Sequence, residues 1–260
     1  MNMHSHIQLP NGILKHFRDE TDMEKKVWCL DLDSGQISRK ATGRLGTAKE
    51  YYSAEMELWL SAQIESPITA LNKKIRRFAA GMEDSVSILP DDVRVAKSYI
   101  KAAWLRSNMA QWEFGESSYT AAVCSKQENH DDLIYAGLCS KGPFDKYLAD
   151  MSMAVLINRT NAHFVVPRNC YYEILSHSCA TIVAPISPTA AILLLPRDYP
   201  VFALGCYGTI DDAEDVRKAN QAALKYEYCC NHDFVAADRE TELKDLLATL
   251  DAIKKTDKLS

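Results

Sequence analysis

The chain of 260 residues lacks the features that mark secreted and membrane proteins. Its first residues, MNMHSHIQLPNGILKHF, contain no continuous apolar stretch of the kind that a signal peptide requires. The longest apolar run, from Ala180 to Pro196, is interrupted by prolines and polar residues, so it is too short and too broken to cross a bilayer. These absences predict a soluble, cytoplasmic protein with no membrane partner.

Cysteine is present, but in no pattern that implies a disulfide scaffold or paired zinc knuckles. The eight cysteines are scattered along a chain long enough to build a core without cross-links, and in an intracellular protein they remain thiols. A looser set of residues has side chains that bind zinc: His163, Cys170, His177, Cys179, Cys229, Cys230 and His232. Because no CxxC pair occurs, buried cysteines acting as small apolar side chains are the favoured interpretation, and no metal or other cofactor is predicted. A Cys-His nucleophile pair stays open, since such partners meet only in the fold.

The chain also lacks an excess of positive charge, since 30 Lys and Arg stand against 35 Asp and Glu, for a formal net charge of -5 and a pI near 5.8. Affinity for nucleic acid comes largely from Lys and Arg that neutralise phosphates, so nucleic acid is disfavoured as the main partner. The chain contains no GxxxxGK[ST], GxGxxG, GxSxG or HExxH motif. The common nucleotide-binding and hydrolase folds are therefore disfavoured.

The patterns that are present predict one compact α+β domain over residues 1–260, in which a mainly antiparallel sheet packs with several helices. The segment VWCLDLDSGQISRK predicts an early β-hairpin around Asp-Ser-Gly. A helical half is expected over about 41–150, a β-rich segment over about 151–207 and C-terminal helices over about 211–256. The apolar runs of the β-rich segment have connections too short for crossover helices, which favours antiparallel pairing.

Proline and glycine mark the expected helix boundaries. Ser66 and Pro67 predict the N-cap and first residue of a helix, and Gly81 stands where that helix should end. A second long helix is expected from Pro90 to Trp112, and a break between helices at 141–143. Near the C-terminus, Asp211 and Glu214 have the spacing of a capping box.

Short motifs also occur in a particular order along the chain. IQLPNGILKHF contains Pro10, Leu14 and Phe17, and WCLDLDSG, KEYYS, IESPITALNKKI, AAWLRS, FVVPRNC, APISPTAAILLLP and VRKANQAA follow. The set resembles a microbial family known as domain of unknown function 4238, with its HxxPxxxLxxF-type N-terminus. The resemblance spans most of the chain and implies no defined activity, beyond a microbial accessory or defence role. Ile7 replaces the family's histidine and Arg168 its aspartate, the two groups best suited to proton transfer or metal binding.

The first candidate site is a set of five polar residues in or beside these motifs: His6, Glu65, Arg106, Asn169 and Asn220. Arg106 can bind a phosphate or carboxylate with two hydrogen bonds, and Glu65 can act as a general base. The two asparagines can hold a substrate. These residues suggest an enzyme, or a degenerate enzyme, acting on a small anionic or phosphate-ester substrate. The alternative is a structural ion pair between Glu65 and Arg106 with asparagines that cap turns.

The second candidate is a basic helix face formed by Lys73, Lys74, Arg76 and Arg77. Four cations within five residues can bind an acidic partner or a phosphate. Aromatic residues suited to base stacking do not alternate with them, so a solvated helix face is the simpler interpretation.

A non-catalytic role is the alternative function. In that case the chain is an interaction module that binds itself or another protein through edge strands or its last helix. The last helix has an apolar stripe formed by Leu243, Leu246, Leu247, Leu250 and Ile253. The sequence does not distinguish a homo-oligomer from a complex with another protein.

Overall fold

A computed structural model describes residues 4–6, 9–49, 51–107, 127–139, 141–176, 179–197 and 207–257. Its helices are α1 (Asn11–Leu14), η1 (Lys15–Phe17), α2 (Ala54–Leu60), η2 (Ser61–Glu65), α3 (Ser66–Ala79), α4 (Pro90–Leu105), α6 (Gln127–Cys139), α7 (Pro143–Ala149), α8 (Ala213–Cys229) and α9 (Glu240–Asp257). Its strands are β1 (His4–His6), β2 (Val27–Asp31), β3 (Ile37–Lys40), β4 (Thr47–Lys49), β5 (Met151–Asn158), β6 (Val166–Pro167), β7 (Tyr172–Ser176), β8 (Cys179–Ser187), β9 (Ala190–Pro196), β10 (Tyr207–Ile210) and β11 (Phe234–Ala237). The fold is α+β, as predicted.

The strands form two larger sheets and a small β1-β4 ribbon. The five-stranded sheet has the order β10-β5-β9-β8-β7, and the four-stranded sheet has the order β3-β2-β11-β6. Both are mainly antiparallel, as predicted, although β10 pairs with β5 in parallel. The β-rich segment contributes strands to both sheets, because β6 pairs with β11 in the four-stranded sheet, whereas β5, β7, β8 and β9 belong to the five-stranded sheet. The strand β11 was not predicted, since a buried run of four apolar residues between two helices has no periodicity that identifies it.

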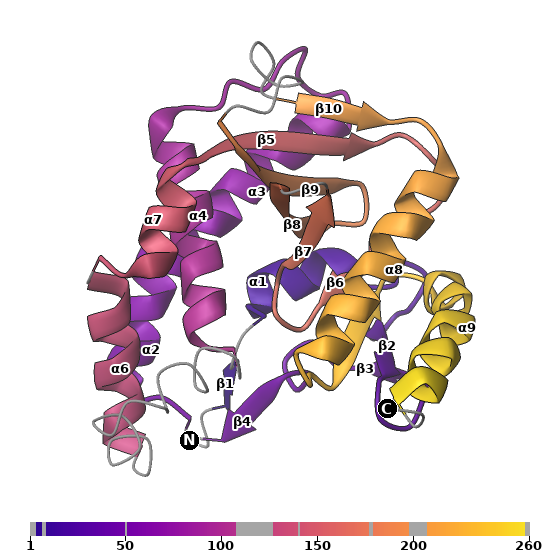
Figure 1. Cartoon of the computed structure of the whole chain (residues 1–260), viewed down its shortest axis with the longest axis horizontal. Helices are drawn as coiled ribbons and strands as arrows, with labels where there is room; N and C mark the ends of the chain where they lie inside the picture. Colours follow the sequence, from indigo (N-terminus) through magenta and orange to yellow (C-terminus); the bar gives the residue numbers. More distant parts are fainter. Residues whose placement is uncertain are drawn as a thin grey trace.

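Two hydrophobic cores lie on opposite faces of the five-stranded sheet. On β9, Ile192 and Leu194 belong to the core shared with α3 and α4, whereas Leu193 and Leu195 belong to the core shared with α8 and α9. Because both faces of β9 are covered, its sequence is a continuous apolar run without alternation. Figure 1 shows α2, α4, α6 and α7 gathered on one side of the molecule and α8 and α9 on the other.

The helix start predicted at Ser66-Pro67 is wrong. The helix begins at Ala54, and α2, η2 and α3 continue without interruption to Ala79. Ser53 is its N-cap, and the Ser53 hydroxyl accepts a hydrogen bond from the Met56 N–H at 3.1 Å. A proline inside a helix removes one backbone hydrogen bond, and the wider π-helical turn η2 accommodates that loss just before Pro67. The predicted end is correct, since Gly81 has a φ of 69° and donates its N–H to Phe78.

Three other helix boundaries were predicted from proline, glycine and capping residues, and they can be compared with the structure. The break at 141–143 is confirmed between α6 and α7. The capping box is displaced by one residue, because Asp212 and not Asp211 caps α8 through the Glu214 N–H. The helix α4 ends at Leu105, before the expected Trp112, which lies outside the described residues. Among the helices in the described ranges, none has the length and apolarity needed to cross a membrane.

Candidate functional site

The centre of the candidate site is Arg106, which directly follows the last residue of α4. Its backbone N–H still donates to the Ala102 carbonyl at 3.2 Å, so the helix geometry fixes the direction of the side chain. Arg106 is only 2% exposed, and its Nε and Nη2 have no hydrogen-bond partner in the described part of the chain. Buried polar atoms are nearly always paired, so an arginine edge left unpaired inside a protein calls for a functional explanation.

Glu65 is the second member of the site. It is the last residue of the π-helical turn η2, a feature often found at functional sites, and it remains partly exposed. Burial raises the pKa of its carboxyl, the Arg106 charge opposes this shift and Glu57 adds to it. The charge of Arg106 thus acts on the Glu65 carboxyl, while no ion pair joins the two side chains in the described part of the chain.

Two tyrosines that the sequence did not single out complete the polar surroundings of Arg106. The Arg106 guanidinium lies 5.5 Å from the centre of the Tyr52 ring, and Tyr99 on α4 also interacts with its charge. Both side chains are buried, and burial raises the pKa of both hydroxyls. Tyr99 has the spacing of an ordinary core residue of α4, and Tyr52 lies just before α2, so neither was identified in the sequence as a functional residue.

A loop between β6 and β7 brings Cys170 to the same place. This loop crosses from one sheet to the other, and Cys170 adopts a φ of 69°, a strained value for a residue other than glycine. Its thiol lies against the Tyr99 hydroxyl and feels the charge of Arg106. Hereafter, the Arg106 cluster means Tyr52, Glu65, Tyr99, Arg106 and Cys170.

Cys170 is poorly suited to act as the nucleophile of a Cys-His pair. Its side chain is fully buried, and burial raises the pKa of the thiol to about 12. A cysteine nucleophile requires a thiolate, which an electropositive and partly exposed site normally provides. Cys170 therefore contributes shape and polarity to the cluster in its neutral form.

Alkylation tests this assignment. Iodoacetamide at pH 8 should modify the exposed Cys139 and Cys229 of the folded protein and react with Cys170 more than about a hundredfold more slowly, because few thiolates form and access is blocked. Peptide mass spectrometry of timed samples gives the three rates. Labelling of Cys170 as fast as of Cys139 would show an activated thiol and contradict the assignment.

The neighbouring Asn169 is held in place from the opposite side. It is 1% exposed, and its backbone N–H donates to Glu227 Oε1 at 3.3 Å. The second carboxyl oxygen of Glu227 lies 3.1 Å from Nδ1 of His232, and both of these side chains are fully buried. The Asn169 side chain interacts with the Tyr171 hydroxyl and lowers the pKa of that hydroxyl, against the larger effect of burial. Asn169 thus lies in the loop that carries Cys170, and its contacts hold this loop in place.

Asn220 has a different place in the fold. Its side chain on α8 accepts from the Val165 N–H at 3.0 Å and donates to the His163 carbonyl at 2.8 Å. These two bonds tie the segment before β6 to α8 and use the amide for structure. His6 lies on β1, which pairs with β4, and its side chain lies outside the described part of the structure.

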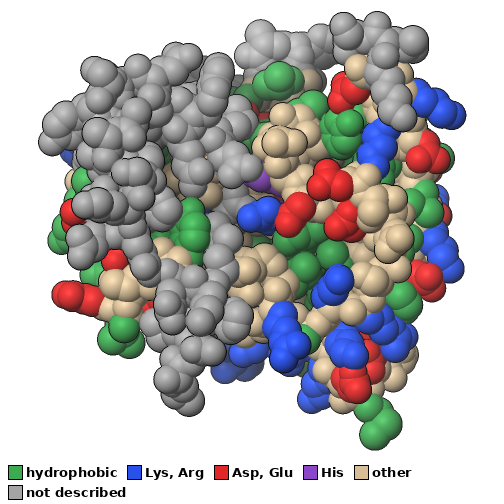
Figure 2. All heavy atoms as spheres, turned by 90° about the horizontal axis from the view of Figure 1, so that it is seen from below, with side chains coloured by type: hydrophobic (Ala, Val, Ile, Leu, Met, Phe, Trp, Pro, Cys, Tyr) green, Lys and Arg blue, Asp and Glu red, His purple; other side chains and the backbone are tan. Residues whose placement is uncertain are grey.

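The basic face on α3 is largely neutralised by partners on neighbouring segments. Lys74 pairs with Asp92 at 2.6 Å and Arg77 with Glu83 at 2.7 Å. Arg76 lies 2.6 Å from a ring nitrogen of His16, and burial followed by the Arg76 charge lowers the pKa of this histidine to about 4. Lys73 is exposed. On the face drawn in Figure 2, Lys and Arg side chains are likewise interspersed with Asp and Glu.

Metal ligands do not gather in the described part of the chain, where no three His, Cys, Asp or Glu side chains come together. His163 instead contacts Asp238 at 2.7 Å, while His232 contacts Glu227. His177 lies outside the described residues.

Comparison of the chain with models of protein families, with curated proteins and with solved structures gives no match. The resemblance to domain of unknown function 4238 therefore stays a prediction. At two positions the chain differs from the pattern of that family. Ile7 lies outside the described residues, and Arg168 forms an ion pair with Asp233.

Proposed function

We propose that the chain is an enzyme, or a degenerate enzyme, whose substrate is a small molecule with a carboxylate or phosphate-ester group that binds Arg106. The observation that carries this proposal is the buried guanidinium with Nε and Nη2 unpaired within the described residues. These two nitrogens form one edge of the guanidinium plane. Their N–H groups match the spacing of two oxygens of a carboxylate or phosphate, which arginine binds in this bidentate manner.

Glu65 supplies the acid-base group in this proposal. Glu65 is the member of the cluster that is partly exposed, so we propose that solvent and substrate approach from its side. The raised pKa makes its carboxylate a stronger base than an ordinary glutamate, as proton transfer requires. With a phosphate ester, Glu65 takes a proton from water as the water oxygen bonds to phosphorus and the bond from phosphorus to the alcohol oxygen breaks. The protonated Glu65 then returns its proton to the departing alcohol oxygen, or to solvent when the leaving group is a stable anion such as p-nitrophenolate. The Arg106 charge offsets the negative charge of the phosphate oxygens.

Calorimetry and a turnover assay test the proposal together. The wild type should bind inorganic phosphate or acetate at one site, and it should hydrolyse p-nitrophenyl phosphate if phosphate esters are its substrates. The variant Glu65→Gln should retain binding and lose about a hundredfold or more in kcat, the usual contribution of a general base. Glu55→Gln, at an exposed position on α2, is the matched control and should behave as wild type.

Two results would contradict the proposal. Failure of both anions to bind would remove the role of Arg106. Equal activities of Glu65→Gln and Glu55→Gln would remove the role of Glu65. Binding without turnover of any ester would leave the degenerate form of the proposal, an anion-binding protein.

The alternative role as an interaction module loses one of its supports in the structure. Leu243, Leu246 and Leu250 of α9 are at most 1% exposed and pack in the core with α8, β2 and β11. Leu247 and Ile253 are partly buried against the same core. The apolar stripe of the last helix therefore stabilises this chain and offers little surface to a partner.

A further inference from the structure

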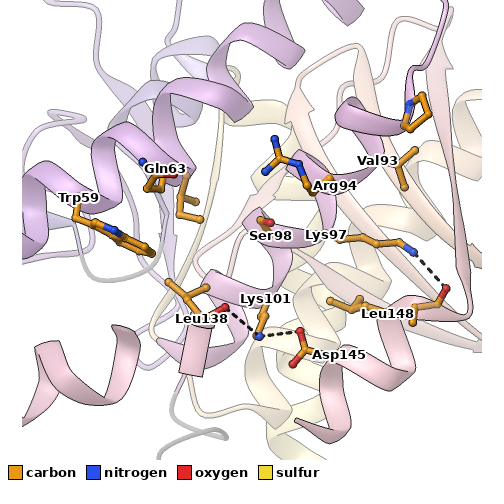
Figure 3. Close-up of a pocket in the computed structure, with 13 residues that line it drawn as sticks. Trp59, Gln63, Val93, Arg94, Lys97, Ser98, Lys101, Leu138, Asp145 and Leu148 are labelled. Carbon is orange, nitrogen blue, oxygen red and sulfur yellow. Dashed lines mark hydrogen bonds and ion pairs between the residues drawn. The ribbon is translucent and has the colours of Figure 1, made fainter. Parts of the chain in front are cut away.

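A second candidate binding site lies on another face of α4. A cleft of about 470 Å³ is enclosed by α2, η2, α4, α6 and α7, and Figure 3 shows its lining side chains. This volume is within the range of roughly 300–1,000 Å³ typical of small-molecule sites. Lys97 and Lys101 line this α4 cleft, whereas Tyr99 and Arg106 belong to the Arg106 cluster. The two sites thus use different side chains of the same segment.

The charges that line the α4 cleft are mostly positive. Arg94, Lys97 and Lys101 occur three and four residues apart on α4, so they lie along one side of the helix. Among the described lining residues, Asp145 is the one carboxylate, and it pairs with Lys101 at 2.7 Å. Arg94 also has a partner, because it forms an exposed ion pair with Asp91, a residue that does not line the cleft.

Lys97 is the cation best placed to bind a ligand. In Figure 3 its side chain runs towards α7, at the end of the cleft away from Trp59, and within the described residues its ammonium makes one long hydrogen bond of 3.5 Å, to the Ala149 carbonyl. Burial and then the nearby Arg197 lower the pKa of its ammonium, while Asp150 opposes the shift. An ammonium that is partly desolvated and close to another cation gains from an anion more than a solvated lysine does.

The other walls of the α4 cleft are apolar and include an aromatic ring. Ile64, Val93 and Leu148 line it, and Trp59 stands at one end. The far side of the Trp59 ring system is occupied by Tyr135, whose ring meets it edge to face at 5.3 Å. A flat, apolar ring can pack against such walls, and the polar groups of Gln63 and Ser98 can orient it.

We infer that the α4 cleft binds a small aromatic anion, with its acidic group at Lys97 and its ring packed against the apolar wall that includes Val93 and Leu148. The shared chemistry is a flat ring that carries a sulfonate, carboxylate or phosphate. This site is distinct from the one in the proposed function, and either can exist without the other.

Isothermal titration calorimetry of the full chain with naphthalene-2-sulfonate tests this inference. Inorganic sulfate provides the charge without the ring, and 2-naphthol provides the ring without the permanent charge. Both should bind at least about tenfold more weakly than naphthalene-2-sulfonate, because each lacks one of the two contacts. Lys97→Met should weaken naphthalene-2-sulfonate by about tenfold, whereas Lys97→Arg should stay within about threefold of wild type.

Two further variants separate the α4 cleft from general charge effects. Lys225→Met removes a cation from the exposed face of α8 and should bind as wild type. Ser98→Asp places a negative charge in the cleft and should weaken binding at least as much as Lys97→Met. Circular dichroism and the melting temperature confirm that each variant is folded.

The inference is overturned if Lys97→Met and Lys225→Met bind naphthalene-2-sulfonate equally well, or if 2-naphthol binds as tightly as the sulfonate. Neither result affects the proposed function, because Lys97→Met leaves Arg106 and Glu65 intact. Unchanged phosphate or acetate binding by Lys97→Met, together with weakened naphthalene-2-sulfonate binding, supports two separate sites.

Discussion

Replacing Arg106 with methionine should abolish the binding of phosphate and acetate without lowering the free energy of unfolding. Methionine keeps the length of the aliphatic stem and removes a buried charge whose Nε and Nη2 have no partner in the described residues. Burying such a charge is costly, and replacing charged groups in a core by apolar ones of similar volume is often neutral or stabilising by about 1–4 kcal/mol. If Arg106 serves to bind the anion, the variant Arg106→Met should therefore be inactive and at least as stable as wild type.

The structural interpretation of Arg106 makes the opposite prediction. If Arg106 serves mainly as the partner of Glu65, its removal leaves a half-buried carboxylate alone and should cost about 3–5 kcal/mol. Urea denaturation of wild type, Arg106→Met, Glu65→Gln and the double variant separates the two cases, since a structural pair shows a coupling free energy above about 1 kcal/mol. Arg159→Met, at an exposed position, is the matched control. A strongly destabilised Arg106→Met that regains stability with Glu65→Gln would identify a structural pair.

The sequence predicted the fold class because local chemistry decides most of it. The Asp-Ser-Gly turn joins β2 to β3, and Gly81 ends α3, because few residues fit those backbone conformations. The prediction failed where a long-range effect overrode a local one. Ser66 and Pro67 have the chemistry of a helix start, yet packing of α2 and α3 against one core keeps the helix continuous through η2.

The site was predicted in part for a similar reason. Glu65 and Arg106 were identified because they lie in the motifs IESPITALNKKI and AAWLRS and have side chains able to bind or protonate a substrate. Tyr52 and Tyr99 were missed, because each has an ordinary role as a core residue. Cys170 was considered as a residue that can bind zinc, and its place beside Tyr99 was not predicted, because only the fold brings the three together. Cys170 comes from a loop between two sheets, and no spacing within the sequence predicts which helix that loop meets.

Replacing Glu227 with alanine should be the most destabilising of these changes, at about 3–5 kcal/mol. Glu227 is fully buried, and its two oxygens meet the Asn169 N–H and His232. Alanine leaves both groups buried without their acceptor and releases the loop that carries Cys170. The matched control is Glu83→Ala, which removes an exposed ion pair with Arg77 and should cost less than about 1 kcal/mol. Urea denaturation measures both, and equal effects would show that burial does not make the Glu227 contacts special.

Glu227→Gln separates the hydrogen bonds of this residue from its charge. Burial raises the pKa of Glu227 above its ordinary value of 4.5, although the hydrogen bond from His232 opposes the shift. The folded state therefore holds this proton to higher pH than the unfolded chain does, and the free energy of unfolding falls as pH rises from 4.5 towards the folded pKa. Burial shifts Glu65, Glu173 and Glu242 in the same direction, so only the difference between wild type and Glu227→Gln isolates Glu227.

Glutamine keeps an oxygen that can accept from Asn169 and cannot ionise, so Glu227→Gln should gain stability relative to wild type between pH 5 and pH 8. Urea midpoints at these two values give the comparison, and parallel pH dependences in the two proteins would contradict it. Phosphate affinity should be lower in Glu227→Ala than in Glu227→Gln, because the retained acceptor still holds the loop beside Arg106. Glu227 would then be a positioning residue, which fixes the Asn169–Cys170 backbone while Arg106 makes the contact with the anion.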